Sequence, residues 1–450
     1  MTVPLSTKSE DPMSIPRQKH FDVIVIGAGP SGMMASFSAS ESGASVLLLE
    51  KKERPGKKLL LTGHGRCNMT NLRIPHNFLE AYHENARFLT SSFHAFPPEE
   101  VREFFRSLGV PSHEEDDGRI FPDSQTSASV CDALERALSD AGVKVQYSSP
   151  VTYVEKDSHD PEGKSRFLVK TENEEYSSRA VILCTGGKSF PHTGSEGDGY
   201  ALAVGNGHTV TSLAPALAPI LLSSFSDSSP DRREDCGAEF TLAGITLPDV
   251  GTYLRIDGKK GKSARGDLLF THQGVSGPAA MRLSRELPVN TGKYPAGKVQ
   301  FVIDMLPDLR EDQVEEKLLC AMTENPNRHM KRLLCETFHL QEKAAILVLS
   351  GETMDLSANE VRKEVRKTIV RNLKASAFDV EKCTPVDIAY VTRGGVNIRE
   401  ISPKTMGSKI TEGLFFAGEV MDIDGISGGY NLQHAWASGR AAGKAAAEYV

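Results

Sequence analysis

The sequence has no apolar run of about 18 or more residues, the length that crosses a membrane, and residues 1–20 have no apolar segment typical of a signal peptide. Its seven cysteines include no C-x-x-C pair, which argues against a disulfide framework and a cysteine zinc site. The charge is modest, because 52 Lys and Arg against 59 Asp and Glu give a net charge of −7. We therefore expect a cytoplasmic protein with no membrane partner and no metal, and we do not expect nucleic acid as a partner.

The sequence does contain a glycine-rich turn directly after an apolar strand. The stretch DVIVIGAGPSG places Gly27, Gly29 and Gly32 in a G-x-G-x-x-G pattern. The first glycine allows a tight turn, the second lets the backbone approach a pyrophosphate, and the third lets the next helix pack close to the strand. The pyrophosphate then lies at the helix N-terminus, where unpaired N–H groups favour an anion.

A second apolar strand, residues 45–49, ends in Glu50, which follows Gly32 by eighteen residues. A carboxylate at this place accepts hydrogen bonds from a ribose diol and disfavours a 2′-phosphate. We therefore predict a dinucleotide with an unphosphorylated adenosine. The basic run after Glu50, which includes Lys51 and Lys58, is placed to face the phosphates in part.

Two later stretches repeat the pattern of an apolar strand followed by glycines, one ending at 185–187 and the other at 418–419. A glycine pair, 428–429, then opens a C-terminal helix of small residues. A nicotinamide dehydrogenase needs one fingerprint and a catalytic domain, whereas an extended FAD commonly meets a second strand end and a C-terminal strand-turn-helix. We predict non-covalently bound FAD, with Glu419 near its ribityl or pyrophosphate region and the N–H groups of 429–432 facing the flavin ring.

The loop 57–71 changes from apolar residues to glycines and hydrogen-bonding side chains, which suits a loop wrapped on a ligand. No residue is assigned a catalytic role, because His272 and His434 fit structural roles at least as well as acid–base roles. The predicted cofactor-binding residues are Gly27, Gly29, Pro30, Ser31, Gly32, Glu50, Lys51, Lys58, Thr62, Gly65, Arg66, Cys67, Asn68, Val151, Thr185, Gly186, Gly187, Gly418, Glu419, Gly429, Tyr430, Asn431 and Leu432.

Changes of composition and period divide the chain. Residues 1–20 are polar and without periodicity, which favours a disordered extension. Residues 208–307 contain many short β-rich runs broken by Pro and Gly, typical of a β-barrel or sandwich insert. Residues 308–383 have a helical period, which predicts a small helical insert. The remaining ranges, 21–207 and 384–450, form the predicted FAD-binding domain.

Several strings carry a family resemblance. They are GRCNMTN (65–71), GRIFP (118–122), TGGKSFP (185–191), THQGVSGP (271–278), GGV (394–396), TM (405–406) and GEVMD (418–422). Over residues 20–450 the chain resembles the bacterial NAD(P)/FAD-dependent oxidoreductases of the BaiN-like, aminoacetone-oxidase type. The resemblance implies an α/β fold, namely a GR2-type FAD-binding Rossmann-like domain with an inserted β-barrel plus a small helical domain. It also implies that Arg66, Cys67 and Asn68 line the cofactor, although His64 departs from the family's usual G-G-G-R-C-N.

We predict an FAD-dependent oxidoreductase that passes a hydride between NAD(P)H or a small organic donor and an organic acceptor by way of flavin N5. The sequence has no second G-x-G-x-x-G, so NAD(P)H, if used, visits the flavin only transiently. Cys67 has no second cysteine nearby and is expected to serve packing rather than redox chemistry. Two alternatives stay open: an oxidase of small amines or amino-ketones that uses oxygen, and a flavin-containing RNA-modification or RNA-binding factor, suggested by the barrel insert and the basic turn 259–265.

Overall fold

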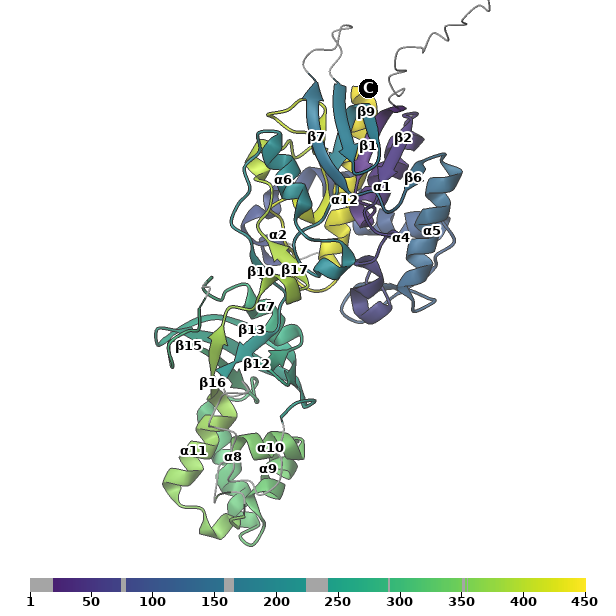
Figure 1. The fold of residues 1–450 in the computed structure, drawn as a ribbon. Coiled ribbons are helices and arrows are strands. Elements are labelled where there is room, and N and C mark those ends of the chain that lie inside the picture. Colours follow the sequence, from purple (N-terminus) through teal and green to yellow (C-terminus); the bar gives the residue numbers. More distant parts are fainter. Residues whose placement is uncertain are drawn as a thin grey trace, which may run out of the picture.

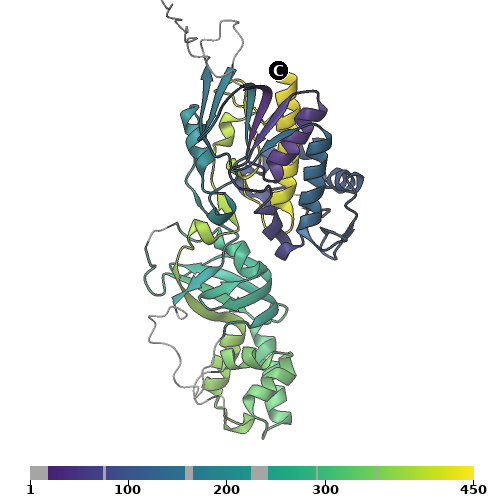
Figure 2. The ribbon, with the colours of Figure 1, turned by 45° about the vertical axis from the view of Figure 1, so that its right-hand side comes forward.

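The computed structural model describes residues 19–73, 78–157, 166–223, 242–289, 292–349, 353 and 355–450. The chain forms three bodies in a row: an α/β body, a β-barrel next to it, and a helical body at the far end (Figures 1 and 2). Residues 1–18 of the predicted extension lie outside the described residues, and Lys19 and His20 already belong to the first strand.

A seven-stranded sheet in the order β6-β2-β1-β9-β8-β7, with β18 paired to β9, forms the centre of the α/β body. The pairs among β6, β2, β1, β9 and β18 are parallel, and β7 and β8 extend the sheet by antiparallel pairing. β2 and β18 are buried along their whole length, as expected for parallel strands covered on both faces. The strands are β1 (Lys19–Ile26), β2 (Val46–Leu49), β6 (Lys144–Gln146), β7 (Val151–Asp157), β8 (Arg166–Thr171), β9 (Glu175–Leu183) and β18 (Leu414–Phe416).

Small residues let the first and last helices pack backbone to backbone. A Cβ added at Gly439 of α12 (Tyr430–Tyr449) would lie 2.4 Å from Ser31 O, and one at Gly443 would lie 2.2 Å from Ala35 O, both in α1 (Pro30–Glu41). Further helices and a three-stranded sheet complete the body: α2 (Phe78–Tyr82), α3 (Thr90–Ala95), α4 (Pro98–Ser107), α5 (Ser127–Asp140), α6 (Asp198–Gly205), β3 (Thr70–Asn71), β4 (Ser112–Glu114) and β5 (Arg119–Pro122).

The register of three parallel strands brings their ends to one edge of the sheet. Ile26, the last residue of β1, lies beside Leu183 of β9, and Phe416 of β18 lies on the other side of Leu183. The turns that follow β1, β9 and β18 therefore start next to one another. These are the three turns for which the sequence predicted a shared ligand.

The insert contains a closed barrel rather than a sandwich, in the strand order β11-β14-β13-β12-β15-β16. Its elements are β11 (Ile220–Leu222), β12 (Thr246–Ile256), β13 (Lys259–Thr271), β14 (Gly274–Ser276), α7 (Pro278–Ser284), β15 (Val299–Asp304) and β16 (Ser376–Lys382). β16 falls inside 308–383, the range that we expected to be a helical insert. It pairs with both β15 and β11.

Among the described residues, the α-helices of the far body are α8 (Glu311–Glu324), α9 (Met330–Phe338), α10 (Glu342–Val348) and α11 (Lys363–Ala375). Their buried apolar faces join those of the barrel in one continuous hydrophobic core, which is distinct from the core of the α/β body. None of the helices in the described part of the chain combines the length and the apolar character that crossing a membrane requires.

The chain enters and leaves the insert at adjacent points. β10 (Ala214–Ala216), just before the barrel, pairs antiparallel with β17 (Val391–Arg393), just after it. The two connections therefore run side by side between the α/β body and the barrel.

A buried ion pair also joins the two bodies. Arg285, which follows α7, donates from Nε to Asp424 Oδ2 (2.7 Å) and from Nη2 to Asp424 Oδ1 (3.1 Å). Nη2 also donates to Glu84 Oε1 (2.9 Å). The Arg285 and Asp424 side chains are 9% and 4% exposed, so solvent screens this bidentate pair little.

Replacing Asp424 by Asn removes the charge but keeps the size, which leaves the buried Arg285 without its main partner. We expect a loss of about 3 kcal/mol in the free energy of unfolding, measured by urea unfolding followed by circular dichroism. The control is Glu103→Gln in the exposed Glu103–Arg106 pair, for which we expect no measurable change. Equal stability of the Asp424→Asn and wild-type proteins would contradict the prediction.

Candidate functional site

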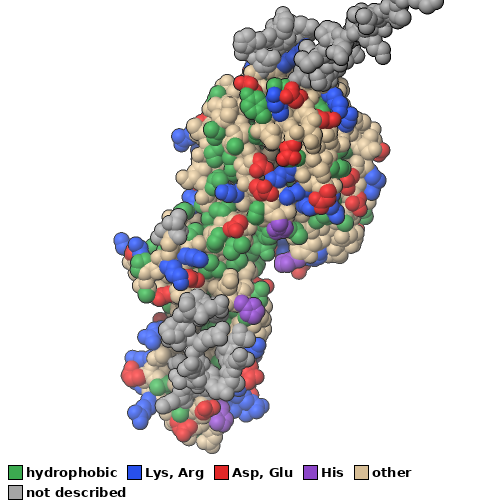
Figure 3. Space-filling view, in the orientation of Figure 1, with side chains coloured by type: hydrophobic (Ala, Val, Ile, Leu, Met, Phe, Trp, Pro, Cys, Tyr) green, Lys and Arg blue, Asp and Glu red, His purple; other side chains and the backbone are tan. Residues whose placement is uncertain are grey.

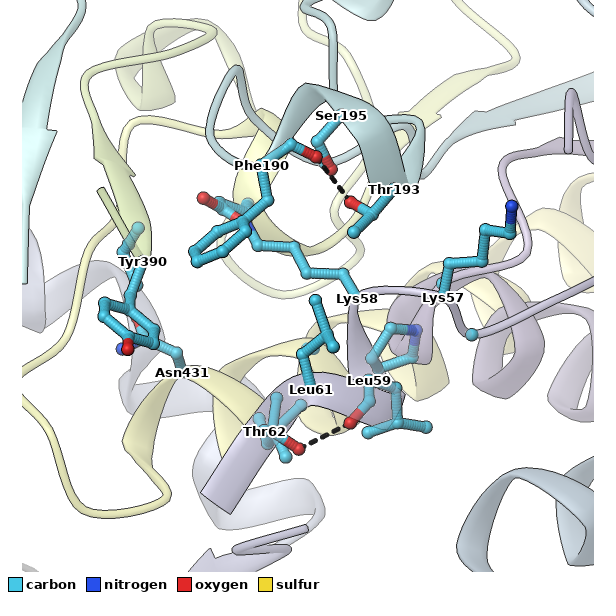
Figure 4. A pocket seen from close by; sticks show the side chains of 18 of the residues that line it. Lys57, Lys58, Leu59, Leu61, Thr62, Phe190, Thr193, Ser195, Tyr390 and Asn431 are labelled. Carbon is cyan, nitrogen blue, oxygen red and sulfur yellow. Dashed lines mark hydrogen bonds and ion pairs between the residues drawn. The ribbon is translucent and has the colours of Figure 1, made fainter. Parts of the chain in front are cut away.

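A single cavity of about 550 Å³ lies where the three strand ends meet, and it extends to the barrel. The α/β body contributes the turn after β1, the loop after β2, residues 185–186 and the start of α12. The barrel contributes Leu269 of β13, the segment 276–278 and Met281 of α7. Figure 4 shows side chains of the loop after β2, of the segment 190–195, and of Tyr390 and Asn431 around one space.

In the turn after β1, one glycine faces open space and another is packed against the protein backbone. A Cβ added at Gly29 meets no heavy atom of the described residues within 4 Å, whereas a Cβ at Gly32 would lie 1.8 Å from Gly27 O. Gly27 itself has φ of +99°, which favours glycine. α1 begins at Pro30, and within the described chain no side chain caps it, so the start of the helix at 29–31, which lines the cavity, is open to a ligand.

Two backbone amides hold the Glu50 carboxylate at the edge of this turn. Oε2 accepts from Ala28 N (2.7 Å) and Oε1 accepts from Lys52 N (2.8 Å). Burial raises the pKa of Glu50 above its ordinary value. Each carboxylate oxygen has a further lone pair, so this fixed group can still accept the two hydroxyls of a ribose.

Hydrogen bonds through Glu419 join the turn after β18 to three other segments of the chain. Lys58 Nζ donates to Glu419 Oε2 (2.8 Å) and to Ser189 Oγ (2.7 Å), and Thr392 N donates to Glu419 Oε1 (2.8 Å). Because protein donors already hold the carboxylate, the network fixes the loop after β2 against the turn after β18. Both Lys58 and Glu419 line the cavity.

Lys51 is paired with carboxylates across the cavity rim. Its Nζ lies 2.5 Å from Asp198 Oδ2 and 3.1 Å from Glu196 Oε2, at the start of α6. The ammonium of Lys51 thus already has two anionic partners within the protein. Its contact with a phosphate stays a prediction. The ion pairs hold α6 near the end of β2.

The loop before β3 is bonded to the start of α12. With its amide oxygen turned towards the helix, Asn68 accepts from Gly429 N (2.9 Å). Gly429, at φ +95°, precedes the helix, and Trp436 Nε1 donates to Met69 O (2.9 Å). The N–H of Gly429 is thus used within the protein, and the N–H groups of 430–432 belong to the first helical turn, which has no earlier turn to pair with.

Most of the predicted cofactor-binding residues line the cavity. These are Gly27, Gly29, Pro30, Ser31, Glu50, Lys51, Lys58, Thr62, Arg66, Asn68, Val151, Thr185, Gly186, Glu419, Gly429, Asn431 and Leu432. Their contacts with a cofactor stay predictions.

Six predicted residues do not line the cavity, namely Gly32, Gly65, Cys67, Gly187, Gly418 and Tyr430. Gly32, Gly187 and Gly418 instead allow close packing, since an added Cβ would meet Gly27 O, Thr392 Oγ1 or Ser31 Oγ within 2.5 Å. Cys67 is fully buried, and burial raises the pKa of its thiol to about 12. This agrees with packing rather than redox chemistry.

Tyr430 is buried, which raises the pKa of its phenol. Its hydroxyl donates to Arg73 O (3.0 Å), so its side chain supports the loop rather than the cavity. Gly65 has φ of +84° in the turn of the loop after β2. Tyr430 and Gly65 therefore help to set the backbone conformation near the site, but they do not line the cavity.

Sequence reasoning missed the apolar end of the cavity, which we define as Leu61, Phe190, Leu217, Leu269, Met281 and Tyr390. Leu61, Leu269 and Tyr390 are 46%, 37% and 46% exposed, although they are large and apolar. Figure 4 shows Leu61, Phe190 and Tyr390 around the same space, and Figure 3 shows hydrophobic side chains gathered where the α/β body meets the barrel. These residues are far apart in sequence and share no motif, so only the fold brings them together.

His434 lies beside this site on α12 and is 2% exposed. Its Nε2 lies 3.3 Å from Gly418 O, which makes it the structural donor that the sequence suggested. Burial lowers the pKa of His434 to about 4, so the ring is neutral at pH 7.

The profile of the family described as "HI0933-like protein Rossmann domain" matches residues 21–445. The chain belongs to this family. It is 32% identical to a "3-dehydro-bile acid delta(4,6)-reductase" of Clostridium scindens, over 94% of this chain and 98% of the relative. It is 31% identical to a "Ribosomal RNA dihydrouridine synthase" of Escherichia coli, over 93% of this chain and 96% of the relative. The BaiN-like resemblance is thereby confirmed, and the protein is an enzyme of an FAD-dependent oxidoreductase family.

The residues present fit FAD. The open approach to Gly29 and the two helix starts without side-chain caps suit phosphate and ring oxygens, within the part of the chain that is described. Thr185 Oγ1 and His434 Nδ1 are buried polar atoms with no partner among the described residues. Such atoms are expected where a polar ligand completes the structure.

A methyl group at Gly29 would project into the cavity without touching the protein. We expect Gly29→Ala to keep the wild-type unfolding midpoint as apoprotein and to weaken FAD binding at least about tenfold, which is about 1.4 kcal/mol. Fluorescence titration of the apoprotein with FAD measures this. Gly32→Ala is the matched comparison, because its methyl group collides with Gly27 O and should lower the stability of the apoprotein itself. Unchanged FAD affinity of Gly29→Ala would contradict the prediction.

Because folded His434 is neutral at pH 7, the free energy of unfolding should depend on pH in one direction. The unfolded chain takes up a proton near pH 6.5, whereas folded His434 does so only near pH 4. Stability is therefore lost as the pH falls from 6.5 to 4, by about 3 kcal/mol in total. We expect His434→Gln to show a flatter profile than the wild type by this amount, in urea unfolding of the apoprotein between pH 7 and 4. Parallel profiles would show that His434 is protonated at its ordinary pH.

Proposed function

We propose that the protein uses NAD(P)H to reduce a carbon–carbon double bond conjugated to a carbonyl group, in a compound with a large apolar part. FAD, when bound, supplies hydride transfer at its N5 atom. The observation that supports the proposal is the continuity of one cavity from the predicted cofactor residues to the apolar end. The names of the two relatives support the reaction class, since a delta(4,6)-reductase and a dihydrouridine synthase both saturate a ring double bond near a carbonyl.

The protein's own residues bind, orient and exclude water. Glu50 and the start of α1 would hold the adenosine and pyrophosphate, and the start of α12 would face the flavin ring. The apolar end would cover the substrate, because exposed Leu269 and Tyr390 gain by leaving water on binding. NAD(P)H would enter the same cavity transiently.

An apolar small molecule fits this site better than RNA. The basic segment 259–265, expected to be a turn, lies on strand β13. In it, Arg265 is paired with Asp249 and Asp308, and Lys262 with Glu286. These carboxylates offset the charge that would attract a phosphate backbone. RNA stays the second candidate because two relatives are named as ribosomal RNA dihydrouridine synthases.

Anaerobic mixing of the FAD-loaded protein with NADH or NADPH tests the donor. We expect rapid loss of the visible flavin absorbance, followed by its recovery when an apolar conjugated enone is added. Recovery with uridine-containing RNA instead of the enone would favour the RNA candidate. Failure of both nucleotides, together with oxygen consumption on small amines, would overturn the reductase in favour of an oxidase.

Polar substitutions at the apolar end should weaken substrate binding. We expect Leu269→Ser and Tyr390→Ser each to raise KM for an apolar enone about fivefold, which is about 1 kcal/mol, with FAD affinity unchanged. The matched controls are Leu319→Ser and Tyr153→Ser, which change equally exposed residues outside the cavity. Steady-state kinetics measures KM, and equal effects in both pairs would contradict the assignment.

A further inference from the structure

His434 has one ring nitrogen bonded to the protein and one that is free. Nε2 faces Gly418 O at 3.3 Å, and Nδ1 has no partner among the described residues. The side chain is 2% exposed and lines the cavity. It was not among the residues predicted to bind the cofactor.

The partner of Nε2 decides the tautomer. A carbonyl oxygen only accepts hydrogen bonds, so Nε2 must carry the proton that bonds to Gly418 O. The buried ring is neutral, because burial disfavours its charged form. Nδ1 therefore has a lone pair and no proton, and it can only accept a hydrogen bond. The group that completes this site must be a donor.

The orientation of the ring is fixed from both sides of Gly418. Gly418 N donates to Ser438 Oγ (3.0 Å), and Ser438 Oγ donates to His434 O (2.6 Å). Gly418 is thus bonded through its N–H to one turn of α12 and through its carbonyl to the His434 ring. This clamp keeps the ring, and with it Nδ1, in one orientation.

A second buried atom on the wall lacks a partner in the described chain. Thr185 Oγ1, just after β9, is packed against Gly199 and can donate or accept. Unpaired buried polar atoms cost free energy unless a ligand or water satisfies them. Thr185 follows β9, His434 lies in the second turn of α12, and both residues line the cavity. A chain of hydroxyl groups is the ligand chemistry that suits an acceptor and a donor–acceptor on one wall.

We propose that His434 accepts a hydrogen bond through Nδ1 from a hydroxyl of the ribityl chain of FAD, and that Thr185 completes this subsite. The proposal goes beyond the proposed function, because it requires FAD but no particular substrate. His434 is then a cofactor-binding residue as well as a brace for Gly418.

The variant His434→Gln tests the proposal, because its amide N–H can still donate to Gly418 O while the acceptor at Nδ1 is lost. We expect its apoprotein to bind FAD about tenfold more weakly than the wild type, by fluorescence titration. Its affinity for ADP, measured by isothermal titration calorimetry, should stay unchanged, because ADP has no ribityl chain.

His208→Gln is the control, since it changes another buried histidine, bonded to Glu400 and Ser408, that does not line the cavity. We expect it to lower the unfolding midpoint of the apoprotein and to change FAD affinity less than about twofold. If His434→Gln binds FAD as tightly as the wild type, or loses FAD and ADP affinity in equal proportion, the proposal is overturned. Both readouts are independent of turnover, so a failed reductase assay leaves this test intact. If His434→Gln does not fold, Thr185→Val carries the same prediction of weaker FAD and unchanged ADP binding.

Discussion

The parallel pairing of β9 with β1 on one side and β18 on the other is the constraint on which the site depends. Leu183 lies between Ile26 and Phe416, so three turns from distant parts of the chain begin side by side. Each turn alone offers a few backbone donors or a carboxylate. Together they form one continuous wall, and the buried strands hold that wall rigid.

The sequence predicted much of this wall, because a glycine turn directly after a buried strand is typical of a nucleotide site. Gly27, Gly29 and Gly32 could be read as a nucleotide turn from their spacing, and Glu50 from its place after the second strand. The same reasoning also selected Gly187 and Gly418, which do not line the cavity. In both, the missing Cβ makes room for Thr392 or Ser31 rather than for a ligand. A sequence records that a glycine is needed but not which neighbour needs the space.

The apolar end was beyond sequence analysis for a different reason. Leu269 sits on a barrel strand and Tyr390 on the return from the insert, and each looks like an ordinary core residue in a β-rich run. Only the docking of the barrel on the α/β body brings both exposed side chains into one cavity. β16 escaped recognition as well, because it follows α11 without a break and the helical period runs up to it.

The paired connections β10 and β17 have a mechanical consequence. Two antiparallel segments bonded to each other form one connection, and the barrel and the helical body share a core, so we expect these two bodies to move together relative to the α/β body. The Arg285–Asp424 contact lies beside this connection, because Arg393 of β17 donates from Nη1 to Arg285 O (3.2 Å). The insert is therefore joined to the α/β body in one region, and rotation about that region would carry Leu269 and Met281 towards or away from the nucleotide end of the cavity.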